Sequence, residues 1–205
     1  MRDILSDKKI IVTENIIQEI LNISRDAGKA IMEVYKTDFS IQIKDDLSPV
    51  TQADREANVI IEDRLKNIDK TIPILSEEGK DIIYEERKKW DTFWLVDPLD
   101  GTKEFIKKND EFTVNIALIM DQVPVFGVVY APAIDLLFWG SLDKGAWKKE
   151  ALNPIEAMFV AAQIEETVHI AASRSHPSSK MNKFISQFKK YKIEPMGSSL
   201  KICRV

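Results

Sequence analysis

Apolar side chains recur with a helical period in the first part of the chain. Over residues 13–35 they lie mostly three or four positions apart, and Thr13 is a residue type that caps helices well. Residues 51–68 repeat this pattern, and the connection between the two segments alternates around Ile41 and Ile43. The sequence therefore predicts two long amphipathic helices, with one strand of a hairpin in the polar segment between them.

The pattern changes after residue 70 from a helical period to short apolar runs. These runs are rich in β-branched and aromatic residues and are bounded by Pro, Gly or Asp: "IPILSEE", "FWLVD", "FTVNIALIM", "VPVFGVVYAP", "DLLFWGS" and "GAWKK". Such runs are typical of strands, here of a largely antiparallel sheet. Two long helices packed on this sheet make a layered α/β domain, which we place at residues 1–157.

A second, smaller α/β unit is predicted over residues 158–205. It contains a strand at "TVHIAAS", a helix near residues 180–190 and a strand at "YKIEPM". No internal repeat or low-complexity segment interrupts either unit. The sequence thus predicts one large and one small unit.

The composition narrows the classes of partner. Of the 205 residues, 44% are hydrophobic and 30% are charged, as in an ordinary soluble protein. The net charge of -4 is spread without a basic stripe, which argues against binding to a nucleic-acid polymer. The single Cys203 allows no internal disulfide, and the charged N-terminal stretch lacks the apolar core of a signal peptide or membrane span. We expect a cytoplasmic monomer or homodimer.

The stretch "WLVDPLDGTKEF" carries the first chemical signal. Asp97 follows an apolar run, and Pro98 predicts a turn that brings Asp100 back beside it. Two carboxylates that close together repel each other unless they share a proton or hold a cation. Gly101 and Thr102 then begin a short helix, whose free N–H groups suit an anion. A cation site beside an anion site is the arrangement that phosphate chemistry on Mg²⁺ requires.

A lone "DPLDG" is more often a plain turn, so other acidic signals matter. Glu77 and Glu78 end an apolar run in "LSEEG", and Asp54 lies in the first turn of the second predicted helix. Each has a structural alternative: the glutamates fit a solvated turn, and Thr51 with Asp54 fits a capping box. Because all of these clusters lie at the edge of an apolar element, together they favour a cation site.

These residues carry a resemblance to a known family. In order, "SPVTQAD", "PILSEEG", "WLVDPLDGTKEFIKKNDEFTVNIALI", "GVVYAP", "ASRSH" and "GSSLK" resemble the inositol monophosphatase superfamily of Mg²⁺-dependent, lithium-sensitive phosphatases. Lys103, Glu104 and Phe105 follow the Gly-Thr pair where inositol monophosphatases usually have Asn-Phe and a nearby histidine. This difference makes the chain more similar to the bacterial 3′(2′),5′-bisphosphate nucleotidase branch.

The resemblance implies a layered α/β sandwich of the sugar-phosphatase type and a specific reaction. The nucleotidase branch removes the 3′-phosphate of adenosine 3′,5′-bisphosphate, which would serve by-product clearance in sulfate assimilation. Two alternatives stay open: an inositol or sugar monophosphatase of the same fold, and a non-catalytic binder of phosphorylated nucleotides.

The resemblance also implies two or more Mg²⁺ ions and their ligands. Glu77, Asp97 and the backbone carbonyl of Leu99 match the ligands of the first ion, and Asp97 would bridge to a second ion held by Asp100. Glu77, Leu99 and Asp100 also match positions beside the substrate phosphate. Glu78 has no catalytic role in the family pattern, so we expect it to support the ligands.

Further matches concern water and substrate. Asp54 and Thr102 match the pair that orients the attacking water, and Gly101 and Thr102 would give N–H groups to the phosphate. On the nucleotide side, the matching residues are Ser173, His176, Gly197, Ser198 and Lys201.

Family members continue past the "GSSLK" helix to a Trp-Asp motif whose aspartate completes the second metal site. No such motif follows "KICRV", so the second unit looks C-terminally truncated. On this basis we expect the chain to bind the first metal ion through Glu77, Asp97 and Leu99 and to hold the second weakly. We also expect it to hydrolyse phosphate poorly or not at all and to expose apolar surface near its C-terminal end.

Overall fold

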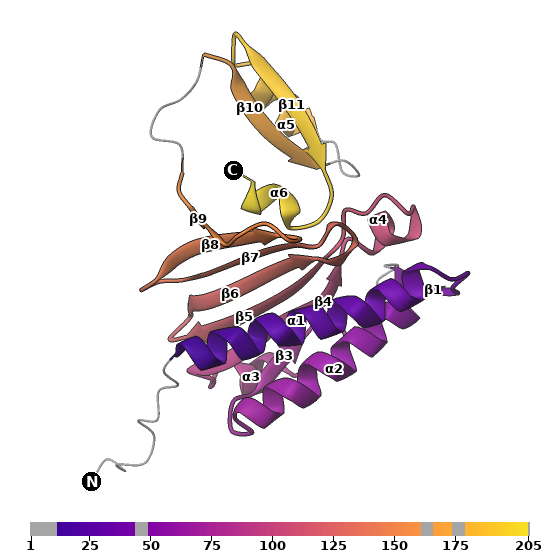
Figure 1. Ribbon diagram of the computed structural model, residues 1–205, viewed down its shortest axis with the longest axis vertical. Coiled ribbons are helices and arrows are strands. Elements are labelled where there is room, and N and C mark those ends of the chain that lie inside the picture. Colours follow the sequence, from indigo (N-terminus) through magenta and orange to yellow (C-terminus); the bar gives the residue numbers. More distant parts are fainter. Residues whose placement is uncertain (1–11, 44–48, 161–165, 174–178, 205) are drawn as a thin grey trace.

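Two long helices form one layer of the molecule and a sheet forms the next (Figure 1). A computed structural model describes residues 12–43, 49–160, 166–173 and 179–204. The helices α1 (Glu14–Tyr35) and α2 (Gln52–Ile68) pack against each other and against the central strands of the sheet. Both helices begin and end within a residue or two of the predicted bounds, which confirms that part of the fold.

The sheet has seven strands in the order β3-β4-β5-β6-β7-β8-β9. Only the β3–β4 pair is parallel, and the other neighbours are antiparallel, as predicted. The boundary that we placed after residue 157 falls within β9 and stays a prediction. The strands are β3 (Ile74–Ser76), β4 (Thr92–Asp100), β5 (Thr113–Met120), β6 (Val123–Ala131), β7 (Leu136–Ser141), β8 (Gly145–Glu150) and β9 (Glu156–Met158).

The core lies between the two helices and the sheet. The side chain of Thr13 accepts a hydrogen bond from the Ile16 N–H at 3.3 Å, so α1 begins with the predicted cap. The buried positions of both helices recur at helical spacing and meet Trp94 of β4, which is fully buried. Fully buried helix residues include Ile20, Ile23, Ala27, Ile31, Ala53, Ala57, Ile61 and Leu65.

Shorter elements surround this core. The strand β1 (Ile41–Ile43) pairs antiparallel with β2 (Pro49–Thr51), which confirms the predicted hairpin strand. The others are α3 (Tyr84–Arg87), α4 (Thr102–Ile106) and the 3₁₀ turn η1 (Pro132–Ile134). Among the described residues, no helix combines the length and the apolar character that crossing a membrane requires.

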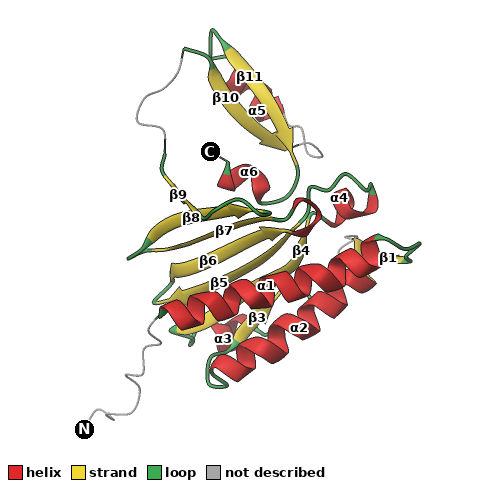
Figure 2. Cartoon of the chain, in the orientation of Figure 1, coloured by secondary structure: helices red, strands yellow, loops and turns green. Residues whose placement is uncertain are grey.

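The smaller unit contains a parallel pair of strands, β10 (Val168–Ser173) and β11 (Tyr191–Met196), with the helix α5 (Ser179–Ile185). Figure 2 shows the last helix, α6 (Leu200–Cys203), between this pair and the large sheet. Leu200 of α6 is buried against Leu136 and Phe138, whereas Leu137 faces the main core. Because side chains alternate along a strand, α6 packs on the sheet face away from α1 and α2.

Candidate functional site

A bulge in β4 brings two aspartates to one face of the sheet. Asp97 lies opposite Asn115 of β5 and Asp100 lies opposite Thr113, so three steps along β4 match two along β5. Three steps along a regular strand would turn the carboxylates to opposite faces, whereas one extra residue returns Asp100 to the face of Asp97. The prediction of a turn at Pro98 is therefore wrong, because strand pairing continues to Asp100.

The chain turns instead at Gly101, immediately after β4. Its φ of 90° lies in the left-handed region, which glycine adopts without steric cost. A Cβ added here would lie 3.1 Å from the carbonyl oxygen of Glu111 and 3.2 Å from the Cβ of Ser198. Gly101 thus lets the loop before β5 and the segment before α6 approach the end of β4 closely.

Negative charge is concentrated around Asp97. Burial raises the pKa of Asp97 to about 8, and the charges of Glu77, Asp100 and Asp54 add to this effect, while a backbone hydrogen bond from Leu99 opposes it. The four carboxylates come from β4, from α2 and from the residue that follows β3, and a cation between them would relieve their mutual repulsion. The structure therefore gathers all four predicted acidic residues into one electrostatic group.

The donor set fits a hard divalent cation. Among the described residues, no three His, Cys, Asp or Glu side chains converge closely enough to hold a metal ion by themselves. A site of two carboxylates and one backbone carbonyl, as at Glu77, Asp97 and Leu99, needs no such triad, since Mg²⁺ is commonly bound through one or two carboxylates. The Glu77 N–H donates to the Val96 carbonyl at 3.1 Å, which fixes the Glu77 backbone beside β4. These ligand assignments stay predictions.

Asp54 serves the helix cap and the site with different oxygens. Its Oδ2 accepts hydrogen bonds from the Thr51 N–H at 2.8 Å and from the Thr51 hydroxyl at 2.7 Å. The first of these bonds forms the capping box together with the Thr51 hydroxyl oxygen, which accepts from the backbone of the first helical turn. Its Oδ1 faces the Thr102 hydroxyl at 3.4 Å. Burial raises the pKa of Asp54, and the charge of Glu78 contributes, so Glu78 acts on the site through this carboxylate. The two interpretations of Asp54 are therefore compatible.

The "GSSLK" segment lies against the metal end of the site. The Gly197 N–H donates to Oε2 of Glu111 at 2.8 Å, and a Cβ at Gly197 would lie 2.5 Å from Cγ of Glu104. Ser198 is buried with a φ of 47°, and the Lys201 ammonium donates to its carbonyl oxygen. The structure thus brings these three predicted residues close to Gly101.

The other half of the predicted nucleotide side is less defined. Ser173 is half-buried at the end of β10, where it pairs with Met196 of β11. His176 lies outside the described residues. Pairing with Met196 places Ser173 next to the residue that precedes the "GSSLK" segment, and the role of His176 stays a prediction.

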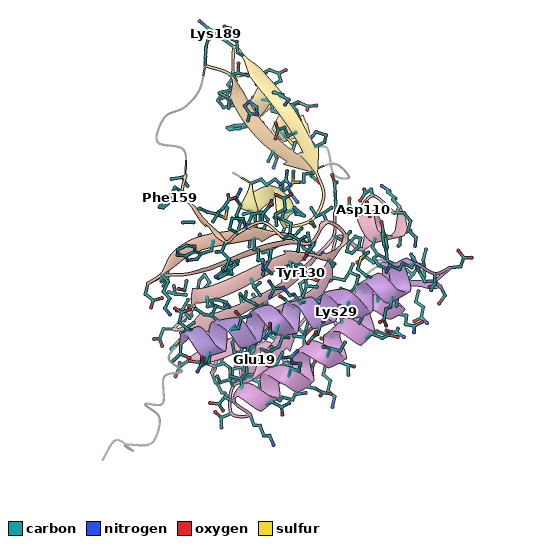
Figure 3. All side chains as sticks on the ribbon, viewed as in Figure 1. Glu19, Lys29, Asp110, Tyr130, Phe159 and Lys189 are labelled. Carbon is teal, nitrogen blue, oxygen red and sulfur yellow. The ribbon has the colours of Figure 1, made fainter. Side chains whose placement is uncertain are left out.

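The loop that carries Glu111 is tied to the end of α1. The Tyr35 hydroxyl donates to Oδ1 of Asp110 at 2.9 Å, at the end of the molecule where Figure 3 labels Asp110. The Lys108 ammonium lies 4.4 Å from the centre of the Tyr35 ring, within cation–π range. These contacts hold in place the loop whose Glu111 binds Gly197.

A cavity of about 750 Å³ opens beside Glu77 and Asp97. Asn115 and Ser199 also line it, and sequence reasoning singled out neither residue. Polar residues at positions 113 and 115 of an otherwise apolar strand were a visible signal, because alternate positions of a strand share one face. Lys80 and Arg87 contribute positive charge to the cavity wall.

Comparisons with known proteins identify the family of the chain. The family model described as "Inositol monophosphatase family" matches residues 13–205. The chain is 41% identical to the 3′(2′),5′-bisphosphate nucleotidase CysQ of Buchnera aphidicola, over 95% of this chain and 72% of that protein. It is 40% identical to the CysQ nucleotidase of Escherichia coli K12, over 92% of this chain and 76% of that one.

Solved structures give the same fold. A crystal structure of CysQ from Bacteroides thetaiotaomicron superposes with a TM-score of 0.78 at 35% identity, covering 95% of this chain and 77% of that one. The extragenic suppressor protein SuhB of Bartonella henselae gives a TM-score of 0.77 at 25% identity, covering 94% and 74%. With the match over residues 13–205, these results show that the chain belongs to the inositol monophosphatase family.

Proposed function

We propose that the protein is a divalent-metal-dependent 3′(2′),5′-bisphosphate nucleotidase, which removes the 3′-phosphate of adenosine 3′,5′-bisphosphate. The identity to two CysQ nucleotidases over more than nine-tenths of this chain supports the substrate class. The observation that carries the reaction type is that Glu77, Asp100 and Asp54 all lie within electrostatic range of the buried Asp97. In this proposal residues 1–157 hold the metal and residues 158–205 hold the nucleotide.

The acidic residues would hold Mg²⁺ beside the phosphate. Glu77, Asp97 and the Leu99 carbonyl are the proposed ligands of a first ion, and Asp97 and Asp100 of a second. When bound, such ions neutralise phosphate charge and lower the pKa of water. The charge repulsion around Asp97 supports this assignment, because a cation bound between neighbouring carboxylates offsets their mutual repulsion.

Asp54 and Thr102 would orient the attacking water. The Thr102 hydroxyl lies 3.4 Å from Oδ1 of Asp54 and 3.4 Å from the carbonyl oxygen of Leu99. With its hydrogen donated to Asp54, its oxygen lone pairs are free to accept a hydrogen bond from water. Burial raises the pKa of Asp54 and so makes this carboxylate a stronger proton acceptor. The pair therefore fixes the direction of the water and offers a place for its proton.

A phosphate-release assay tests the proposal. The protein is assayed with Mg²⁺ on adenosine 3′,5′-bisphosphate, inositol monophosphate and fructose bisphosphate, with a chelator in the control. We expect release from the nucleotide with AMP as the product, slow where the second ion is weakly held, and none with the chelator. Preference for inositol monophosphate would make the protein a sugar-phosphate phosphatase, and binding of the nucleotide without release would make it a non-catalytic binder.

A further inference from the structure

Ser199 lies at the junction of the "GSSLK" segment and the acidic site. Its N–H donates to Oδ2 of Asp100 at 2.5 Å, and its hydroxyl donates to Oδ1 of Asn115 at 2.9 Å. The same hydroxyl oxygen lies 2.9 Å from the Thr113 hydroxyl. One residue of the smaller unit therefore binds three side chains of the large sheet.

The three partners occupy one small area of the sheet. Thr113 pairs directly with Asp100, and Asn115 pairs directly with Asp97. Because Thr113 and Asn115 lie two positions apart on β5, their side chains share one face. Ser199 thus contacts the two residues of β5 that stand opposite the two aspartates of β4.

The directions of these hydrogen bonds follow from the donors available. The single hydroxyl hydrogen of Ser199 is donated to Asn115, so the Ser199 oxygen accepts from Thr113. Thr113 is fully buried, and buried hydroxyls need such a partner. The chain of bonds Thr113 to Ser199 to Asn115 fixes the position of the Ser199 side chain and therefore of its backbone N–H.

We propose that Ser199 is a positioning residue for Asp100. Its hydroxyl, fixed on β5 by Thr113 and Asn115, holds its N–H against the Asp100 carboxylate and so aims the other oxygen of Asp100 at the cation. A hydrogen bond from a backbone N–H to a carboxylate is stronger than one between neutral groups, so this contact can orient the Asp100 side chain. This proposal rests on the proposed metal-dependent function, since it gives Asp100 a cation to bind.

The competing interpretation is that Ser199 only attaches α6 to the sheet. The two interpretations differ in what a hydroxyl deletion changes. Loss of an attachment lowers stability and leaves metal affinity unchanged, whereas loss of a positioning residue weakens metal binding by about tenfold or more. Turnover at saturating metal should then recover, because Ser199 acts on the cation only through Asp100.

Calorimetric titration of the whole protein with Mg²⁺ measures this difference. We compare wild type with Ser199→Ala, with the isosteric Thr113→Val and with the double variant. Ser186→Ala is the control, because its hydroxyl donates to Lys183 in the same unit, far from the acidic residues. We expect the dissociation constant to rise about tenfold in Ser199→Ala and less in Thr113→Val. The double variant should bind Mg²⁺ no more weakly than Ser199→Ala, since both substitutions break the same chain of hydrogen bonds.

Each result decides between the interpretations. A wild-type dissociation constant in Ser199→Ala, with a lowered Tm, would overturn the positioning role and leave only attachment. Additive losses in the double variant would also overturn it. Mg²⁺ binding without phosphate release by wild type would reject the proposed nucleotidase activity and leave this inference intact. No Mg²⁺ binding by wild type would overturn this inference and the metal-dependent chemistry together.

Discussion

The Thr102 hydroxyl lies 3.4 Å from Oδ1 of Asp54, although 48 residues separate the two positions. The contact joins the first turn of α2 to the first residue of α4, so it depends on how both helices pack at the end of β4. Two residues held in this way can act together on one small molecule, such as a water.

Thr102→Ala should lower kcat by roughly 10²-fold or more, within the usual range for assisted proton transfer, and change KM much less. The lost hydroxyl acts mainly in the transition state, because it directs the attacking water. Thr102→Ser is the matched control, since it keeps the hydroxyl. Steady-state kinetics on adenosine 3′,5′-bisphosphate measure both, and a variant with normal kcat but weakened binding would assign Thr102 to phosphate binding alone.

Asp97→Asn should abolish turnover and stabilise the metal-free protein at alkaline pH. The pKa of Asp97 is about 8 in the folded protein against an ordinary value of 3.8, so its ionisation opposes folding. The resulting loss in the free energy of unfolding is absent below about pH 4, grows between pH 4 and 8, and reaches its full size above pH 8. Thermal unfolding with a chelator should therefore show a higher Tm for the variant at pH 8.5 and little difference at pH 4.5.

The opposite trend, with Asp97→Asn less stable at pH 8.5, would mean that the ionised carboxylate has a stabilising partner in the metal-free protein. Retained turnover in the same variant would remove Asp97 from the proposed metal ligands.

Thr51→Ala should reduce both stability and activity. It removes the cap of α2, at about 1 kcal/mol, and one of the two bonds that hold Oδ2 of Asp54. Thr13→Ala removes the cap of α1 without touching the site. Both variants should lose a few degrees of Tm, roughly 2–4 °C for a protein of this size, but only Thr51→Ala should lose kcat. Equal kcat in the two variants would contradict a role for the capping box in catalysis.

Gly197→Ala should destabilise the protein by about 1–3 kcal/mol, as overpacking in a closed site does. Its added Cβ would lie 2.5 Å from Cγ of Glu104 and 2.9 Å from the carbonyl oxygen of Glu111, and the latter is backbone that cannot swing away. The control is Gly127→Ala, whose nearest neighbour would be 4.0 Å away. Denaturant unfolding compares the two variants. An equal free energy of unfolding for both would show that the "GSSLK" segment shifts to accommodate the added Cβ without a loss of stability.

Sequence reasoning succeeded where a long local pattern determines the element. The helices α1 and α2 repeat their apolar residues over many turns and begin with threonine caps, so their bounds could be predicted closely. The strands were found because their β-branched residues lie between turn residues. It failed at the end of β4, where Asp-Pro indicates a turn locally but pairing with β5 extends the strand.

The residues of the candidate site likewise include some that the sequence indicates and one that it does not. Asp54, Glu77, Asp97 and Asp100 could be predicted, because each carboxylate interrupts or ends an apolar element. Ser199 could not, since its role depends on a contact with Asp100 across 99 positions of the chain. Nothing near Ser199 in the sequence indicates which strand residues it meets.

The bulge in β4 limits how many residues can lie between Asp97 and Asp100. Deleting either Pro98 or Leu99 would restore regular pairing with β5 and leave two steps between the carboxylates, which again places both on one face. Adding a residue would set four steps of β4 against two of β5, so the bulge would contain two unpaired residues and the pairing with β5 would be disturbed further. A deletion here removes the bulge whereas an insertion enlarges it, so this segment should tolerate the loss of a residue better than the gain of one, even where the identity of the residues is free to change.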